Sequence, residues 1–521
     1  MKRAAALLAL ASGMVVAASW PLATVMDDHL LANIADPDMG AGMWWTHTFV
    51  DCVLEGRNPF FREELAWPEG QDLRLLMWNI GLQVLLAPIH ALFEPVLAMN
   101  LSAMAIGVTN GLACGWVAWR LTRNPWAAAA SVVVGAGSIY AIYEAGVGRT
   151  EQGFWAPLAI WLGGLLWLRE DGGRRAWILS GLGLGLAGSC YWFHAWFAIP
   201  ITLILALAWR DLRVLGVLGV SLIVVLPSLA LVAPAFWEQG NDYALMMERL
   251  DSEGQKMAGS LEVPAAFLMG KTADPARKVP VLLLPVLVFA ATRPRLRVPA
   301  LVGLGAIVMS LGPILVEDLG RPWIVGDARL RLPAGFLDWA PGHERFWWPY
   351  RWLAVALPAF AICLGGLVSR AGRFAPLAVL GVVLLTVVEG YLGLRNDRPL
   401  HHVLHEAPTD FPELDGPVLV WPPAQVANDL IGYRVFHDQP QGGGIAWDMS
   451  AEVRGPAWGR RVVETGLFQG LNQAAMGAPV TADLSDRAGY RYVLADRPGL
   501  ERALGEPIWT HPPVALFDLG E

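Results

Sequence analysis

The sequence predicts an α-helical polytopic membrane protein that ends in a small α/β domain outside the membrane. Its 521 residues are 55% hydrophobic and only 16% charged, whereas soluble domains carry more charge and fewer apolar residues. About eleven apolar segments are long enough, or nearly so, to cross a hydrocarbon core, which needs about 20 residues. These segments stop near residue 394, and shorter strand-like runs follow.

The apolar segments lie along residues 1–394, which we take as the transmembrane domain. The first, near residues 3–25, also fits a cleavable signal peptide, with small residues at Ala17 and Ala18. Because its apolar run is long enough to cross, we expect it to be retained. The others lie near residues 95–119, 126–143, 153–168, 177–193, 195–209, 213–235, 279–292, 298–316, 348–368 and 374–394.

Short basic loops set the predicted orientation, because Lys and Arg concentrate in cytoplasmic loops. One further apolar run, Leu73–Phe93, is interrupted by Pro88. The basic loops and a cytoplasmic N-terminus agree only if this run does not cross, so we expect a re-entrant or interfacial helix. The prediction is about eleven spans with the C-terminus outside. The basic residues are Arg120, Arg123, Arg169 to Arg175, Arg210, Arg213, Arg293 to Arg297, Arg370 and Arg373.

Residues 395–521 are predicted to form the extracytoplasmic α/β domain. Short apolar runs between Pro- and Gly-rich turns are typical of strands, and they read PVLVWPP, YRYVLAD and PVALFDL. The net charge of -8 and the scattered basic residues give no stripe for nucleic acid. Only Cys52 of the four cysteines lies in a polar segment, so neither a disulfide framework nor a zinc site is predicted.

The first outer loop, residues 26–72, is strongly acidic, with ten carboxylates against two arginines. Apolar residues recur at helical spacing from Trp44 to Val53, which predicts an amphipathic helix along the membrane surface. Gly56 is placed to end this helix. A simple interfacial anchor would show the same pattern.

Asp36 and Asp38 stand just before this helix. Such a pair is typical of a helix N-cap, and it could equally include a catalytic base. Asp27 and Asp28 are a competing pair, since they lie where the chain leaves the first apolar segment.

Two further outer connections hold candidate residues. The short connection 144–152 carries Arg149, Glu151 and Gln152; an ion pair of Arg149 with Glu144 or Glu151 that only orders the loop is the alternative. His194 lies at another outer turn, where a packing histidine is more common than a base.

The third connection leads into the tenth segment and contains His343, Arg345 and Arg351 among many aromatic residues. A guanidinium at the membrane interface is costly unless it meets a carboxylate or a phosphate. Arg345 and Arg351 are therefore candidates for binding a lipid phosphate. An aromatic belt with a snorkelling arginine is the alternative.

These motifs resemble those of bacterial polytopic proteins of the GT-C glycosyltransferase superfamily, which includes protein O-mannosyltransferases and lipid A aminoarabinose transferases. The resemblance covers most of the membrane region and supports a superfamily rather than a substrate. The segments that carry it read ADPDMGAGMWW, LEGRNPFF, WPEGQDL, GRTEQGFWAPLAI and HERFWWPYRWLAVALP.

The resemblance implies an essential acid in the first outer loop and a polyprenyl-phosphate-linked sugar as donor. By position, Asp38 would match that acid, Glu151 a second polar residue facing the cavity, and Arg351 an arginine that contacts phosphate. The acid of this family often lies closer to the first span, in an Asp-Glu pair. Asp36 and the pair Asp27–Asp28 therefore stay as alternatives.

The implied reaction is inverting sugar transfer to a glycan, lipid or protein acceptor at the outer face of a bacterial inner membrane. Asp38 would deprotonate the acceptor hydroxyl, while Arg345 and Arg351, with His343 nearby, would hold the lipid phosphate. No cofactor is expected, although a divalent metal at Asp36 and Asp38 stays an open alternative.

The alternative function is a non-catalytic membrane scaffold, or a transporter or assembly factor for lipid-linked glycans. A transporter should bury ionisable residues near the middle of the membrane. Here most charges cluster at the ends of the apolar segments, with Glu389 as a mild exception, which weighs against ion-coupled transport.

Overall fold

The computed structural model describes most of the chain. Its described residues are 2–520 except for 33, 35–36, 64, 66–69, 75–78, 172, 249–255, 258, 263–265, 267–274, 317–320, 326–327, 338–347, 397–403, 409, 422–440, 443–464, 488, 496–499 and 513.

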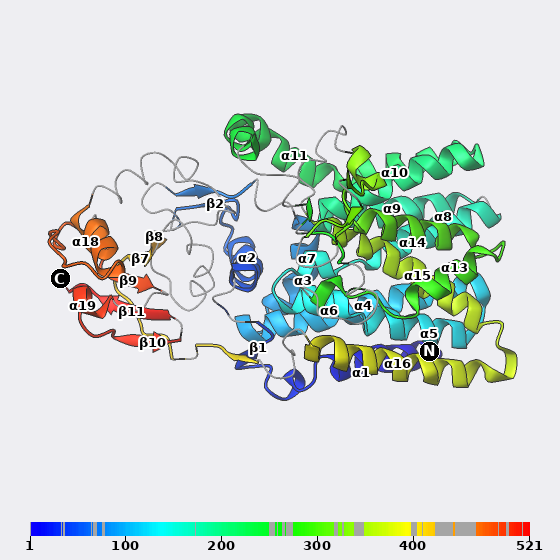
Figure 1. Cartoon of the computed structure of the whole chain (residues 1–521), viewed down its shortest axis with the longest axis horizontal. Coiled ribbons are helices and arrows are strands. Elements are labelled where there is room, and N and C mark those ends of the chain that lie inside the picture. Colours follow the sequence, from blue (N-terminus) through cyan, green and yellow to red (C-terminus); the bar gives the residue numbers. More distant parts are fainter. Residues whose placement is uncertain are drawn as a thin grey trace.

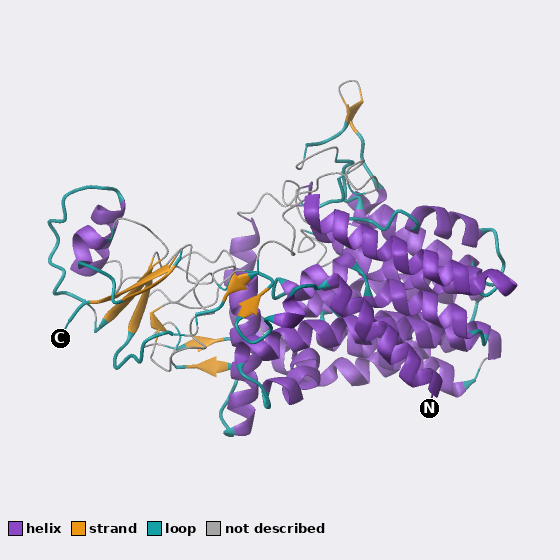
Figure 2. Ribbon diagram, turned by 90° about the horizontal axis from the view of Figure 1, so that it is seen from below, coloured by secondary structure: helices purple, strands orange, loops and turns teal. Residues whose placement is uncertain are grey.

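A bundle of helices packed side by side makes up most of the chain (Figures 1 and 2). Each apolar segment that the sequence predicted overlaps at least one of these helices. They are α1 (Lys2–Ala18), α4 (Pro95–Thr122), α5 (Pro125–Ala136), α6 (Ile139–Gly146), α8 (Ala156–Asp171), α9 (Arg174–Cys190), α10 (Trp192–Trp209), α11 (Arg213–Glu248), α13 (Leu283–Ala291), α14 (Arg297–Ser310), α15 (Leu353–Val368) and α16 (Ala375–Asn396).

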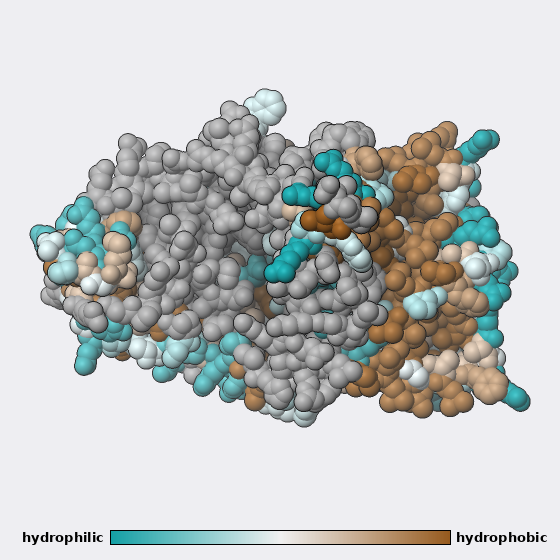
Figure 3. Space-filling model, viewed as in Figure 1, coloured by the Kyte–Doolittle hydropathy of each residue, from teal (hydrophilic) through white to brown (hydrophobic). Residues whose placement is uncertain are grey.

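Among the described residues, 6 helical segments are long and apolar enough to cross a membrane. They are Pro95–Thr122, Pro125–Gly146, Trp192–Trp209, Arg213–Ala235, Pro349–Val368 and Gly372–Gly390. Figure 3 shows a mainly hydrophobic surface over the bundle with hydrophilic residues at its far end, the arrangement expected of a membrane protein. The number of crossings and their orientation stay predictions.

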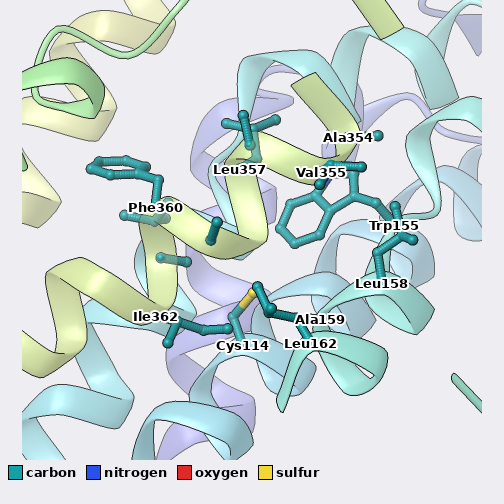
Figure 4. Packing of buried hydrophobic residues seen from close by; sticks show 14 of the residues in the cluster. Cys114, Trp155, Leu158, Ala159, Leu162, Ala354, Val355, Leu357, Phe360 and Ile362 are labelled. Atoms are coloured by element: carbon teal, nitrogen blue, oxygen red, sulfur yellow. The ribbon is translucent and has the colours of Figure 1, made fainter. Parts of the chain in front are cut away.

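Helix α15 lies at the centre of the bundle, since 94% of the span that contains it is buried. Trp155 and Leu158 lie beside Val355 of this helix (Figure 4). On the neighbouring pair α4 and α5, a Cβ on Gly111 would lie 2.8 Å from the Ala136 side chain. Such small residues allow close approach between helices in a membrane.

The first outer loop forms a helix, α2 (Pro37–Leu54), which ends near Gly56 at φ +70, as the sequence predicted. Its side chains Trp44 and Phe49 are buried in a cluster with Leu65 of the same loop and Leu73, the residue that follows the loop. The apolar face thus packs largely on protein. Val53, predicted to share this face, is 56% exposed, because it lies in the last turn, beyond that cluster.

In the described part of the run Leu73–Phe93, which leaves out residues 75–78, the structure has one short helix, α3 (Ile80–His90), of 11 residues. At 1.5 Å per residue, this is roughly half the length that a hydrocarbon core of about 30 Å requires. The length agrees with the prediction that this run does not cross. Its place relative to a membrane stays a prediction.

After α16 the chain builds a five-stranded mixed sheet, the C-terminal sheet, in the order β10-β11-β9-β7-β8. Strands β7 and β9 pair in parallel, and β9, β11 and β10 pair antiparallel. Three strands fall on the runs that the sequence predicted. The bounds are β7 (Val418–Trp421), β8 (Gln441–Gly442), β9 (Tyr492–Ala495), β10 (Trp509–His511) and β11 (Val514–Asp518).

The two faces of the C-terminal sheet pack on different partners. One face buries Leu419 and Val493 in a cluster that includes Leu471 of α18 (Gly466–Ala475) and lies beside α19 (Glu501–Leu504). The other face buries Val420 and Leu494 against residues of the first outer loop. Strand β1 (His29–Leu30) of that loop also pairs with β6 (His405–Glu406). The remaining described strands are β2 (Phe61–Arg62), β3 (Gln71–Asp72), β4 (Ile324–Val325) and β5 (Ala328–Arg329).

Candidate active site

Asp38 lies in the first turn of α2 rather than in the loop before it, since the helix begins at Pro37. Proline is favoured at this position because it has no amide hydrogen to leave unpaired. A carboxylate in the first turn is stabilised by the partial positive charge of the helix N-terminus. Asp36, the other candidate of the pair, lies outside the described residues.

Two glycines bring this turn against the connection that carries Arg149. A Cβ on Gly148, which has φ +93, would lie 2.2 Å from the backbone oxygen of Asp38. A Cβ on Gly42 would lie 2.3 Å from the backbone oxygen of Gly148. Only glycine combines this approach with a positive φ. The C-terminal sheet also packs on this turn, since Met39 and Val147 share a buried cluster with residues of that sheet.

The contact brings Arg149 between two carboxylates from different elements. Its Nε lies 2.9 Å from Oε2 of Glu144 on α6 and 3.5 Å from Oδ2 of Asp38 on α2. Tyr350 donates a hydrogen bond of 2.6 Å to Oε1 of Glu144, and Arg149 Nη1 donates one of 3.4 Å to the Tyr350 hydroxyl. We call these four residues the acidic network. The ion pair within the short connection is thus only part of a larger arrangement.

Arg351 follows Tyr350 in the turn Pro349–Trp352 that leads into α15. It is only 7% exposed, so snorkelling to water does not explain it. Its Cζ lies 5.9 Å from the ring of Tyr191, 6.0 Å from that of Phe193 and 5.7 Å from that of Trp348. Within the part of the chain that the structure describes, no carboxylate pairs with it.

Glu151 is close enough to Asp38 and Arg351 for both charges to affect its pKa. It belongs to the short helix α7 (Thr150–Gly153) and is joined to Gln152 by a 3.5 Å hydrogen bond from the amide nitrogen. Burial raises the pKa of its carboxyl, and the charge of Asp38 adds to this, whereas Arg351 lowers that pKa. The carboxyl therefore interacts with the charges of both Asp38 and Arg351.

Asn110 of α4 fixes the chain where α7 meets α8. Its amide nitrogen donates to the backbone oxygen of Gly153 at 2.8 Å, and its amide oxygen accepts from the backbone nitrogen of Ala156 at 2.7 Å. A buried asparagine that satisfies both backbone groups is a rigid link. The connection that carries Arg149 and Glu151 is thereby held against the helical core.

His194 lies in the first turn of α10 and is fully buried. Its ring centroid is 4.9 Å from that of Tyr191. Because Tyr191 also lies beside Arg351, His194 belongs to the same site.

The structure brings together six of the predicted residues: Asp38, Arg149, Glu151, Gln152, His194 and Arg351. His343 and Arg345 lie outside the described residues, as does Asp36. Sequence reasoning missed Tyr350 and Tyr191 as parts of the site, although Tyr350 directly precedes Arg351. It also missed Arg277, whose Cζ lies 5.4 Å from the Tyr350 ring and whose Nη1 is 3.4 Å from Glu262.

No model of a known protein family matches this sequence, and no curated protein sequence matches it significantly. Solved structures do match. ArnT from Cupriavidus metallidurans in the apo state aligns at a TM-score of 0.59 and 13% identity, covering 99% of this chain and 98% of that one. The same protein bound to undecaprenyl phosphate aligns at 0.58, with the same identity and coverage.

A second neighbour is the oligosaccharyltransferase AglB from Archaeoglobus fulgidus in complex with an inhibitory peptide and a dolichol-phosphate. It aligns at a TM-score of 0.50 and 13% identity, over 96% of this chain and 69% of that chain. At such identities the likeness concerns the fold. The chain has the fold of ArnT and AglB, which agrees with the resemblance to GT-C glycosyltransferases that its motifs suggested.

Proposed function

We propose that this protein transfers a sugar from a polyprenyl-phosphate donor to an acceptor at the outer face of a bacterial inner membrane. The fold supports a transferase of this class, and the neighbours are a protein bound to undecaprenyl phosphate and one in complex with a dolichol-phosphate. In this proposal the N-terminus is cytoplasmic, while the site and the C-terminal sheet lie outside. The acceptor is a glycan, a lipid or a protein.

The main support for the proposal is that one site contains an arginine paired with carboxylates and a second arginine without such a pair among the described residues. Arg149 is held by Glu144 and Asp38, whereas Arg351 is buried among aromatic rings with no described carboxylate beside it. A buried cation of this kind is suited to an anionic ligand. The site thus offers a carboxylate base on one side and a cationic binding group on the other, joined by the neighbours Tyr350 and Arg351.

The proposed mechanism is a single displacement. Asp38 accepts the proton of the acceptor hydroxyl, and the hydroxyl oxygen then attacks the anomeric carbon. The bond from that carbon to the phosphate oxygen breaks on the opposite face, so the configuration inverts. Arg351 stabilises the negative charge of the departing lipid phosphate, and Arg149 orients the Asp38 carboxylate. These steps invoke no metal, because Arg351 stabilises the negative charge of the leaving group.

Asp38→Asn tests the role of the base. A lost general base typically costs about 10²–10⁴-fold in rate, so we expect release of lipid phosphate from undecaprenyl-phosphate-linked sugars to fall by that much in proteoliposomes. The matched control is Asp51→Asn on the same helix. The Asp51 carboxylate is half exposed and lies 3.6 Å from His47, so it contacts no described residue of the candidate site. The control should keep wild-type activity.

Retained transfer by Asp38→Asn would refute the assignment, and Asp27→Asn and Asp28→Asn would then identify the competing base. If the wild type bound the donor lipids but released no lipid phosphate from any pentose or hexose donor, the non-catalytic scaffold would be the better description. Stereochemical analysis of the product tests the inverting course.

A further inference from the structure

Two buried side chains of the site, His194 and Arg351, have nitrogen atoms without a hydrogen-bond partner among the described residues. His194 is 0% exposed, and neither Nδ1 nor Nε2 has a hydrogen-bond partner among the described residues. The same holds for Nε of Arg351, which is 7% exposed. Leaving buried polar groups unsatisfied is costly, and native structures rarely do so without a reason. A ligand that accepts hydrogen bonds would satisfy both side chains.

These side chains meet around one aromatic residue. The ring of Tyr191 lies 4.9 Å from that of His194, and the Cζ of Arg351 lies 5.9 Å from the Tyr191 ring. Phe193, the residue before His194, is 6.0 Å from the same Cζ. These side chains therefore lie where the start of α10 meets the turn before α15.

The start of α10 adds a third favourable element. The helix is 18 residues long, and its N-cap residue Tyr191 makes no side-chain capping bond. The N-terminus of a helix carries partial positive charge and backbone amides that bind anions. His194 stands in this first turn, beside the positive charge of Arg351. A neutral imidazole supplies one N–H donor, so the whole arrangement donates toward an anion.

We propose that His194, Arg351 and the N-terminus of α10 form the seat for the phosphate of the lipid donor, with His194 donating a hydrogen bond to a phosphate oxygen. This rests on the proposed function for the donor class, and it makes the start of α10 an anchor of the lipid head. The rings of Tyr191, Phe193 and Trp348 exclude water, which strengthens charge-assisted hydrogen bonds there.

Another buried histidine among the described residues, His90, has a hydrogen-bond partner at one ring nitrogen, whereas its Nδ1 has none. His90, 2% exposed on α3, has its Nε2 3.1 Å from the hydroxyl of Ser102. His194 has no such partner among the described residues. His90→Phe is therefore the matched control for His194→Phe, since the same bulk replaces a buried imidazole outside the proposed seat.

The test compares the binding of undecaprenyl phosphate, undecaprenol and inorganic phosphate to the full chain in nanodiscs. His194→Phe should weaken undecaprenyl phosphate binding about tenfold or more, the value of one charge-assisted hydrogen bond, and leave undecaprenol binding unchanged. His194→Asn, which keeps a donor, should restore part of the affinity and also guards against a Phe variant that fails to fold. His90→Phe should bind all three probes as the wild type does.

Equal binding of undecaprenyl phosphate by His194→Phe and the wild type would overturn the seat, as would an equal loss of undecaprenol binding, because a packing defect affects both lipids. Inorganic phosphate should compete only at far higher concentration; competition at the concentration of the lipid would overturn the lipid assignment. The protein could instead prefer undecaprenyl phosphate over undecaprenol through His194 and yet transfer no sugar. That result would support the phosphate seat and refute the proposed function.

Discussion

The two arginines of the site, Arg149 and Arg351, are both largely buried and both lie near Tyr350, yet their direct contacts differ. Arg149 has Glu144 at 2.9 Å, Asp38 at 3.5 Å and the Tyr350 hydroxyl at 3.4 Å. Arg351 has three aromatic rings within about 6.0 Å and no described carboxylate partner. The first cation organises acids of the protein itself, and the second is available to a ligand.

The packing around the two arginines follows the same division. Val147 and Met39, which flank the acidic network, are buried in the cluster that includes the C-terminal sheet. Tyr350 and Trp352, which flank Arg351, belong to the main cluster of the helical bundle. Asp38, the proposed base, is therefore positioned by the connecting loops, whereas Arg351, the proposed phosphate-binding arginine, is positioned by the helical bundle. Substitutions at the two sites should consequently fail in different ways.

The largest expected effect comes from replacing each arginine by glutamine. Arg149→Gln leaves the Glu144 carboxylate, whose side chain is 0% exposed, without its cation, and breaking a buried pair in this way costs about 3 kcal/mol or more. Arg351→Gln removes a cation that makes no described ion pair and acts on Glu144 and Glu151 only through longer-range charge, so it should cost less stability than Arg149→Gln. Thermal unfolding followed by tryptophan fluorescence measures both effects.

Lipid binding should reverse the order of the two variants. Arg351→Gln should lose roughly tenfold or more in undecaprenyl phosphate affinity, while folded Arg149→Gln should retain most of it. Equal loss of stability in both variants would show that Arg351 is also a structural cation. Equal loss of binding would show that both arginines contact the phosphate, and the division of the site would then be wrong.

A smaller effect is expected from Gly148→Ala, which disturbs only the acidic network. The positive φ of +93 costs a non-glycine residue about 1 kcal/mol or more, and the new Cβ would collide with the backbone of Asp38. We expect the first turn of α2 to move away from Arg149, so that the catalytic rate falls while undecaprenyl phosphate affinity is kept. The control Gly173→Ala has open space around its Cβ and should leave the rate unchanged. A parallel loss of affinity in Gly148→Ala would contradict the separation of the two regions.

Much of this arrangement could be predicted from the sequence because each part has a local signal. The apolar segments follow from hydrocarbon length, α2 from its helical spacing, and Asp38, Arg149 and Arg351 from charged positions beside apolar runs. Each residue sits within its own motif. These signals place residues at the same end of the bundle, and in the structure six of the candidate residues lie near one another there. Their roles stay predictions.

The partners within the site could not be predicted in the same way. Nothing in the spacing of residues 38, 144 and 149 shows that Arg149 contacts Asp38, because this contact depends on Gly42 and Gly148 meeting across two loops. Likewise the aromatic residues beside Arg351 fit an interfacial belt by sequence alone, and only the fold brings the Tyr350 hydroxyl to Glu144. Local patterns carry burial and charge, whereas pairings over long sequence separations depend on tertiary packing.

The smallest expected effect concerns Glu151, whose pKa responds both to Asp38 of the acidic network and to Arg351. Burial and the Asp38 charge raise the pKa of this carboxyl, and Arg351 lowers it. A carboxyl with a raised pKa in the folded state contributes stability at low pH and loses that contribution as the pH rises through the folded pKa. Stability should therefore fall with rising pH above the ordinary glutamate range, and Glu151→Gln should remove this dependence.

The infrared carboxyl band of Glu151, isolated as the difference between wild type and Glu151→Gln, follows its titration directly. Asp38→Asn removes a negative charge and should lower the pKa of Glu151, whereas Arg351→Gln removes a positive charge and should raise it. Opposite shifts require that the Asp38 and Arg351 charges both reach one carboxyl and act independently. Shifts of the same sign would mean that the substitutions rearrange the loop around Glu151, and the two regions would then be a single coupled unit.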